Sequence, residues 1–146
     1  MGFFDFLKDV GTNLFGGGDE AVEIKEMLTK ELGDKITNLD VKFEDGAVTL
    51  SGECDSVATR EKAMLLSGNI KGVEKVDADG LSAPAPKVEE PTTYYTVKRG
   101  DSLSLIAKRH YGDPMKYKQL FEENKEIIKD PNLIYPGQVL RIPKLS

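Results

Sequence analysis

The sequence has little of the chemistry on which many small enzymes and secreted scaffolds depend. Its 146 residues include one cysteine, Cys54, one histidine, His110, and no tryptophan. A single cysteine excludes an intrachain disulfide and a cysteine-rich zinc site, and a single histidine excludes a histidine metal cluster within one chain. The net charge of −5 argues against a broad nucleic-acid-binding surface. We therefore expect no nucleic-acid partner, and a reducing compartment is favoured.

Long apolar runs are missing as well. No stretch approaches the roughly 20 apolar residues of a membrane-spanning helix. The aromatic run from Phe3 to Leu7 is interrupted by Asp5, and Lys8 and Asp9 follow it. The segment therefore lacks the basic start and the unbroken apolar core of a secretory signal. We expect a cytoplasmic protein without stable membrane insertion.

Proline and glycine instead divide the chain into parts. Residues 82–93, SAPAPKVEEPTT, contain three prolines and have neither helical nor strand periodicity. Three consecutive glycines, residues 16–18, form a second break. These breaks predict an amphipathic leader over residues 1–18, a first module over 19–81, a linker over 82–93 and a second module over 94–146.

The first module carries the pattern of a small α+β unit with a mixed sheet. Asp19 is a good helix cap, and apolar residues follow at helical spacing until Gly33, namely Ile24, Met27, Leu28 and Leu32. The pair Asp45-Gly46 predicts a tight hairpin turn between two strands that alternate apolar and polar residues. Ser56 can cap a second helix that ends near Gly68, and a strand is predicted over residues 72–81. The predicted order is α-β-β-α-β.

This order, with GAVTLSG at residues 46–52 and GNIKGVEKVD at residues 68–77, resembles a BON domain. Short valine-rich strands after Asp-Gly turns occur in many folds, so the second module adds weight to the resemblance.

The second module has the predicted order β-α-α-β. Its first strand covers residues 94–97, and Asp101 or Ser102 can cap the helix that follows. One face of this helix is predicted to carry Leu103, Ile106, Ala107 and His110. Tyr117, Leu120, Phe121 and Asn124 predict a second helix, and the turn at residues 135–137 leads into a strand over 138–143. The segments YTVKRGDSLSLIAKRHYG, at 95–112, and NLIYPGQVLRIP, at 132–143, resemble the two ends of a LysM domain.

With the leader MGFFDFLKD, the whole sequence resembles the bacterial potassium-binding proteins that combine a BON and a LysM domain. The resemblance implies a bacterial sensor or buffer for monovalent cations, K⁺ with Rb⁺ or Cs⁺ as substitutes. It also implies that main-chain oxygens hold the ion between the leader and the loop after the second BON helix. Carried across, the ligands are Leu7, Val10, Thr12, Gly68, Ile70 and Val73.

The residue types by themselves give only a weak signal of such a site, because main-chain carbonyls can hold the ion and every residue has one. Free carbonyls are expected at helix ends and in glycine-interrupted loops, and residues 7–12 and 68–73 are of this kind. For any of these residues, the alternative is that Gly68 simply ends a helix and Gly72 starts a strand.

The leader has three interpretations: a membrane-surface helix, a partner-binding helix, or a segment that packs on its own BON domain. A helix would place Phe3, Phe6, Leu7, Val10 and Leu14 on one stripe. A membrane-surface helix normally carries several basic residues, whereas this leader has Lys8 beside two aspartates. Packing on the chain itself is therefore favoured.

A second ligand class follows from the LysM resemblance, since that family binds glycans that contain N-acetylglucosamine. The matching groove positions are Gly100, Asp101, Ser102, Leu103, Leu133, Ile134 and Tyr135. Helix capping and turn formation explain several of them equally well.

Three function classes remain: a cation-binding protein, a peptidoglycan-associated adaptor, and an interaction module with neither ligand. No pair of titratable groups lies in a recognisable catalytic motif, so we expect no enzymatic activity. We also expect a monomer.

Overall fold

The computed structural model describes residues 4–84 and 92–144, and the chain divides into two compact units, residues 1–87 and 88–146. The fold class is α+β, as predicted. The first unit contains β1 (Phe4–Asp5), α1 (Glu20–Leu32), the 3₁₀ turn η1 (Gly33–Lys35), β2 (Ile36–Glu44), β3 (Ala47–Cys54), α2 (Val57–Gly68) and β4 (Lys75–Ser82). The second contains β5 (Thr93–Thr96), α3 (Leu103–Tyr111), the 3₁₀ turn η2 (Pro114–Lys116), α4 (Tyr117–Glu123) and β6 (Val139–Ile142).

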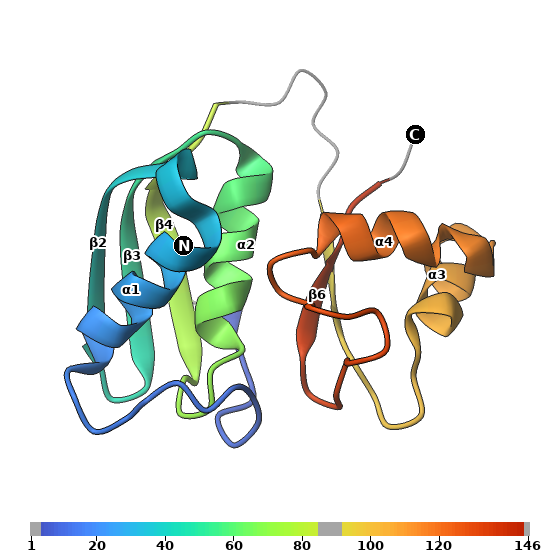
Figure 1. Cartoon of the computed structure of the whole chain (residues 1–146), viewed down its shortest axis with the longest axis horizontal. Coiled ribbons are helices and arrows are strands. Elements are labelled where there is room, and N and C mark those ends of the chain that lie inside the picture. Colours follow the sequence, from blue (N-terminus) through green and yellow to red (C-terminus); the bar gives the residue numbers. More distant parts are fainter. Residues whose placement is uncertain (1–3, 85–91, 145–146) are drawn as a thin grey trace. The chain divides into compact units, whose positions relative to one another are not determined.

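The first unit is a four-stranded mixed sheet covered on one face by α1 and α2 (Figure 1). The strand order is β1-β4-β3-β2, in which β3 and β4 are parallel and the other neighbours are antiparallel. The core between helices and sheet contains the fully buried Ile24, Leu28, Leu50, Leu65 and Val76. The predicted order α-β-β-α-β is confirmed for residues 20–82.

Local sequence signals account for the ends of these elements. The Asp19 side chain accepts hydrogen bonds from the backbone N–H groups of Ala21 and Val22, and Ser56 accepts one from Thr59. Both are caps that supply an acceptor to a first-turn donor. Asp45 and Gly46 have φ of 49° and 79°, as the predicted hairpin turn requires.

The leader is not helical over residues 4–18, so the stripe that a helix would create does not form. Residues Phe4–Asp5 form an edge strand that pairs with Val76 and Lys75 of β4, and no helix occurs in residues 4–18. The side chains of such a stripe instead differ in exposure: Phe6 is buried, Leu7 is exposed, and Val10 and Leu14 are half-buried. Phe3 lies outside the described residues. The open edge of β4 offers backbone partners to the leader that an isolated helix would not use, and the leader does pack on its own unit.

The second unit packs α3 and α4 on the two-stranded sheet formed by β5 and β6. Its core includes Leu103, Ile106, Leu120, Ile128 and Leu140. Ser102 caps α3, and Gly112 ends it in the left-handed conformation with φ of 77°. His110, predicted on the same face as Leu103 and Ile106, lies in the last turn of α3 and is exposed; its ring packs edge-on against Tyr95 with 5.4 Å between centroids.

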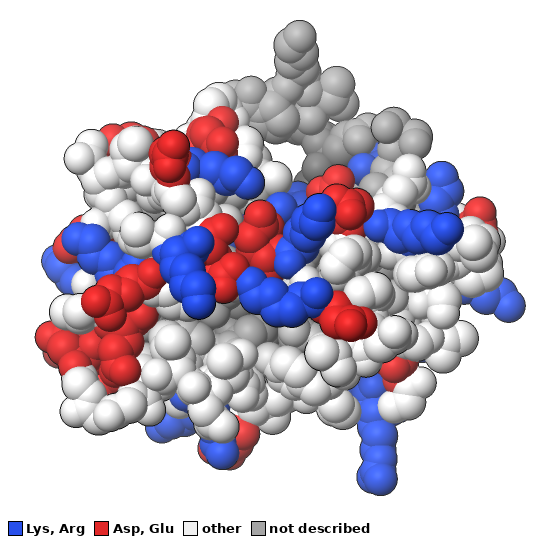
Figure 2. Space-filling view, in the orientation of Figure 1, with Lys and Arg blue, Asp and Glu red and all other residues white. Residues whose placement is uncertain are grey.

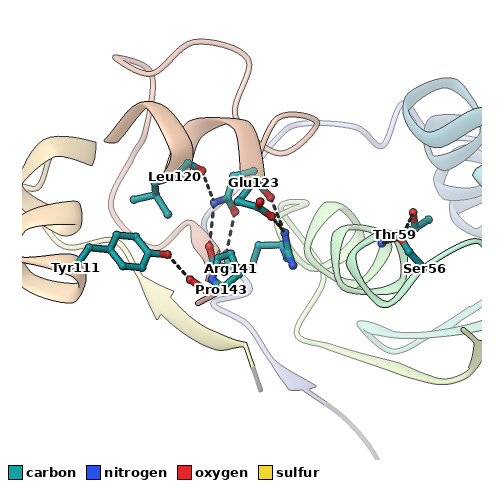
Figure 3. A network of polar contacts seen from close by, with 8 residues as sticks. Ser56, Thr59, Tyr111, Leu120, Glu123, Arg141 and Pro143 are labelled. Carbon is teal, nitrogen blue, oxygen red and sulfur yellow. Dashed lines mark hydrogen bonds and ion pairs between the residues drawn. The ribbon is translucent and has the colours of Figure 1, made fainter. Parts of the chain in front are cut away.

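A polar network joins α4 to β6 in this unit (Figure 3). Asn124 is fully buried; its side-chain amide donates to the carbonyls of Leu120 and Arg141, and its oxygen accepts from Arg141 N–H. The Arg141 guanidinium donates to the carbonyl and to the carboxylate of Glu123, and Tyr111 donates to the Pro143 carbonyl. Burial raises the pKa of Tyr111 to about 12, so its hydroxyl remains a donor at neutral pH.

Candidate functional site

The leader and the loop after α2 lie side by side. Thr12 N–H donates to the Asn69 carbonyl at 2.8 Å, and Lys71 N–H donates to the Thr12 carbonyl at 2.9 Å. These two bonds make an isolated parallel bridge between Thr12 and Ile70. Further along the loop, Gly72 N–H donates to the Lys8 carbonyl at 2.8 Å. The structure thus brings the two segments that carry the predicted ligands into direct backbone contact.

Close approach at this junction depends on Gly11. A Cβ at Gly11 would lie 2.5 Å from the Asn69 carbonyl oxygen and 2.8 Å from Lys71 N. Its φ of 136° is also a conformation that residues with a side chain rarely adopt. No other residue type fits here without moving the leader away from the loop. From the sequence alone, Gly11 is only a glycine within residues 7–12, and its close packing was not predicted.

The six predicted ligands differ in how their carbonyls are used. The carbonyls of Leu7, Thr12 and Ile70 each accept one backbone hydrogen bond, from Val10, Lys71 and Val73 respectively. The carbonyls of Val10, Gly68 and Val73 accept no backbone hydrogen bond from any residue that the structure describes. Because a carbonyl oxygen has two lone pairs, all six oxygens retain acceptor capacity.

The N–H groups of the loop after α2 do not continue the hydrogen bonding of the helix. The Lys71 and Gly72 N–H groups, which would extend the helical ladder to Ser67 and Gly68, donate to leader carbonyls instead. The last turn of α2 contains no basic residue that could bind the freed carbonyls. The partial negative charge of a helix C-terminus therefore meets no cationic side chain within this turn.

Carboxylate, histidine and thiol groups offer no comparable site. Within residues 4–84 and 92–144, no three His, Cys, Asp or Glu side chains are gathered closely enough to hold a metal ion. The lone Cys54 is buried, and this burial raises the pKa of its thiol.

The second unit contains a cavity of about 420 Å³ beside the start of α3. Four of the seven predicted glycan positions line it: Asp101, Ser102, Leu103 and Ile134. Gly100, Leu133 and Tyr135 do not belong to its lining, and Leu133 is exposed. The wall is completed by four residues that were not predicted as groove positions, Ser104, Tyr117, Pro131 and Asn132. Pro131 and Asn132 directly precede the predicted groove positions 133–135, and Asn132 is the first residue of the LysM-like segment 132–143, which was the available signal.

Asp101 holds the loop at one side of this cavity. Its carboxylate accepts hydrogen bonds from the Tyr95 hydroxyl, from Lys98 N–H and from Arg109, which forms an ion pair with it at 2.6 Å. Burial opposes ionisation of this carboxyl, but the three donors outweigh it and lower the pKa of Asp101 to about 2. Ser102, and not Asp101, caps α3, so the sequence alternative between these two residues is resolved.

The fold and these two regions define a two-domain BON and LysM protein. Residues 21–83 match the BON domain family, and residues 95–143 match the LysM domain family. The sequence is 38% identical to the potassium binding protein Kbp of Escherichia coli O6:H1, over 99% of this chain and 99% of that protein. The chain belongs to the same protein family as this potassium binding protein.

Other relatives share parts of the sequence. An uncharacterized protein of Deinococcus radiodurans is 38% identical over 88% of this chain and 56% of its own length. The N-acetylmuramoyl-L-alanine amidase XlyB of Bacillus subtilis is 38% identical over 51% of this chain, but over 22% of its own length. The BON and LysM families to which the two domains belong are families of binding domains.

Charge and hydropathy add two general properties. Figure 2 shows basic and acidic side chains interspersed on the visible face of the chain, without a uniformly basic area among the residues described there. No helix within the described ranges is both long and apolar enough to span a membrane.

Proposed function

We propose that the chain binds a monovalent cation, K⁺, at the junction of the leader and the loop after α2. The proposed ligands are the main-chain oxygens of Leu7, Val10, Thr12, Gly68, Ile70 and Val73. The observation that carries the proposal is the backbone pairing of residues 8–12 with residues 69–72, which brings both halves of the ligand set together. The potassium binding protein Kbp is 38% identical to this chain over 99% of its length, and its name supports the choice of ion.

A potassium ion suits this junction on physical grounds. Carbonyl oxygens can replace its hydration shell, and their dipoles favour the ion without the cost of burying a carboxylate. The end of α2 adds the partial negative charge of a helix C-terminus. Rb⁺ and Cs⁺ are proposed as substitutes, since they share the charge and the weak hydration of K⁺.

Ion binding at this place gives a mechanism for sensing or buffering. An ion that contacts the leader and the loop together binds only the docked state of the leader. By mass action, the ion then stabilises that state and shifts the population toward it. We propose that the chain performs this role in the bacterial cytoplasm as a monomer without catalytic activity and without a nucleic-acid partner.

Thermal unfolding of cation-depleted protein tests the proposal. Chloride salts of potassium, sodium, rubidium, caesium and calcium are compared at matched ionic strength. We expect a saturable rise in Tm with K⁺, Rb⁺ and Cs⁺ and no such rise with Na⁺. Equal responses to all the monovalent salts would indicate charge screening, and would refute a specific site.

Removal of the leader is the matching structural test. Deletion of residues 2–15 removes Leu7, Val10 and Thr12 together with the backbone pairing to the loop. We expect the truncated protein to lose the K⁺-specific rise in Tm. An unchanged K⁺ affinity would show that the ion, if bound, does not use the leader.

A second function is favoured by a separate observation, the cavity in the LysM domain. Its lining combines the hydroxyls of Ser102, Ser104 and Tyr117 with the amide of Asn132, a composition that suits sugar hydroxyl and acetamido groups. We propose N-acetylglucosamine-containing glycan as its ligand. Titration with N-acetylglucosamine oligomers, followed by tyrosine fluorescence, should give saturable binding that Asn132→Ala weakens. Failure of both the salt and the glycan experiments would leave an interaction module with neither ligand.

A further inference from the structure

One aromatic ring of the leader occupies a space that exists because residue 68 is glycine. The Phe6 side chain is only 7% exposed. A Cβ at Gly68 would lie 2.1 Å from Cζ of the Phe6 ring and 2.2 Å from both Cε atoms. Gly68 does not have a positive φ, so its backbone would accept other residues. Space for the ring, and not backbone conformation, is what requires glycine at this position.

The leader is held again at the other end of the loop. The ring of Phe15 would be 3.4 Å from a Cβ at Gly72, and it packs edge-on against Phe43 with 5.4 Å between centroids. Between these two aromatic contacts, the leader exchanges backbone hydrogen bonds with residues 69–72. The loop therefore lies under a short strap whose ends are both fixed by phenylalanine rings.

We infer that Phe6 is a positioning residue for the cation site, acting through Gly68. This inference rests on the proposed function. The Phe6 side chain has no oxygen to offer, but it is adjacent in sequence to Leu7 and in contact with Gly68, one proposed ligand from each segment. Its backbone N–H also donates to the Glu74 carbonyl at 2.8 Å, which continues the pairing of β1 with β4. The ring thus fixes the leader oxygens relative to the end of α2.

Loss of the contact between Phe6 and Gly68 should lower the fraction of molecules in which the leader is docked on the loop. The apparent affinity of a ligand falls in proportion to the fraction of protein in the binding-competent state. If the leader is docked in about one tenth of the molecules, the K⁺ affinity falls about tenfold. A ring that merely fills the core would change Tm equally in Na⁺ and K⁺, and would leave the K⁺ half-saturation point unchanged.

A double-mutant cycle with Phe6→Ala and Gly68→Ala tests the contact. The added methyl group of Gly68→Ala collides with the ring only when the ring is present. We expect each single variant to weaken K⁺ binding about tenfold or more, and we expect Gly68→Ala to have little further effect in the Phe6→Ala background. Wild-type K⁺ affinity in Gly68→Ala, or equal effects of Gly68→Ala in both backgrounds, would overturn the inference.

Amide hydrogen exchange in sodium chloride separates this inference from the proposed function. Thr12, Lys71 and Gly72 donate the bonds that join leader and loop, so their N–H groups should exchange faster in both single variants. If the wild-type protein shows no K⁺-specific response, the proposed function fails, and this exchange pattern still decides whether Phe6 anchors the leader. Unchanged exchange at all three amides would overturn the anchoring itself.

Phe121→Ala provides the matched control. It makes the same chemical change at a half-buried phenylalanine of the second unit, which contributes none of the proposed ligands. We expect it to lower the stability of its own unit while the K⁺ half-saturation point and the exchange of the three amides remain those of the wild type. A shift equal to that of Phe6→Ala would contradict a specific role for Phe6.

Discussion

At the scale of single residues, glycine decides how closely two backbones can approach. Gly11 and Gly68 are both required by space, but different atoms fill the space that each leaves. At Gly11 the neighbour is the backbone of Asn69 and Lys71, whereas at Gly68 it is the Phe6 ring. Backbone atoms cannot rotate away as a side chain can, so a change at Gly11 should be the less tolerated of the two.

Gly11→Ala is therefore expected to abolish the K⁺-specific rise in Tm. Its Cβ would approach the Asn69 carbonyl oxygen to 2.5 Å and would force the leader away from the loop. Gly17→Ala is the control, because Gly17 also has a positive φ of 93° but nothing lies within 4 Å of a Cβ there. Comparison of the two variants in potassium and sodium chloride separates the collision from the backbone strain. Equal losses in both would contradict a role for close packing at Gly11.

Asp101 gives a second prediction at this scale, on pH. Its pKa is lowered from 3.8 to about 2, so the folded carboxyl binds fewer protons than the unfolded one between these values. The stability that it contributes is complete above about pH 4 and is lost as the pH falls toward 2. The difference in unfolding free energy between the wild type and Asp101→Asn should therefore shrink over this range.

Urea unfolding at a series of pH values measures that difference. The chain has no tryptophan, and all five tyrosines lie in the second unit, namely Tyr94, Tyr95, Tyr111, Tyr117 and Tyr135. Tyrosine fluorescence thus follows the domain that contains Asp101. The comparison with Asp101→Asn removes the effect of the other carboxylates that titrate in the same range. A difference independent of pH would mean that the Tyr95, Lys98 and Arg109 donors do not stabilise the charged form.

At the scale of elements, the Asn124 side chain at the end of α4 and the Arg141–Glu123 ion pair join α4 to β6. The buried Asn124 side chain donates to the carbonyls of Leu120 and Arg141 and accepts from the N–H of Arg141. The Asn124 side chain thus pairs the N–H and the carbonyl of Arg141 in β6. Leaving a buried N–H or carbonyl group without a hydrogen-bond partner costs more free energy than a typical hydrogen bond contributes to stability.

Asn124→Ala should destabilise the LysM domain by about 3 kcal/mol, since it leaves buried Arg141 groups unpaired at about 1 to 3 kcal/mol each. Gln119→Ala is the control on the same helix, because Gln119 is exposed and surface changes cost within about 0.5 kcal/mol. Tyrosine-detected urea unfolding measures both. A cost below about 1 kcal/mol for Asn124→Ala would show that water replaces the side chain in the network.

At the scale of the whole molecule, the two candidate ligands belong to different units. All six proposed K⁺ ligands lie in the unit of residues 1–87, and the cavity lined by Ser104 and Asn132 lies in the unit of residues 88–146. The tyrosines report the second unit, whereas five of the six phenylalanines, all but Phe121, lie in the first. The composition of the chain therefore provides a separate optical signal for each unit.

This separation predicts where the cation acts. K⁺ should raise the midpoint of the transition seen in the phenylalanine bands of the near-ultraviolet circular dichroism spectrum, which report mainly the first unit, and should leave the tyrosine fluorescence transition of the second unit unchanged. N-acetylglucosamine oligomers should do the reverse. Sodium chloride at the same ionic strength is the control for both. A tyrosine transition that follows K⁺ would contradict a site confined to residues 1–87.

The sequence by itself determined the two domains and most of their elements, because caps, Asp-Gly turns and apolar periodicity are local signals. Asp19, Ser56 and Ser102 cap their helices in the structure as their positions predict. Only the tertiary structure decided that the leader forms the strand β1 and that Pro131 and Asn132 complete the cavity. It also decided that backbone atoms pack against Gly11 and that the Phe6 ring packs against Gly68. A strand partner, a free carbonyl and a space beside a glycine all depend on residues far away in sequence, and a local pattern does not contain that information.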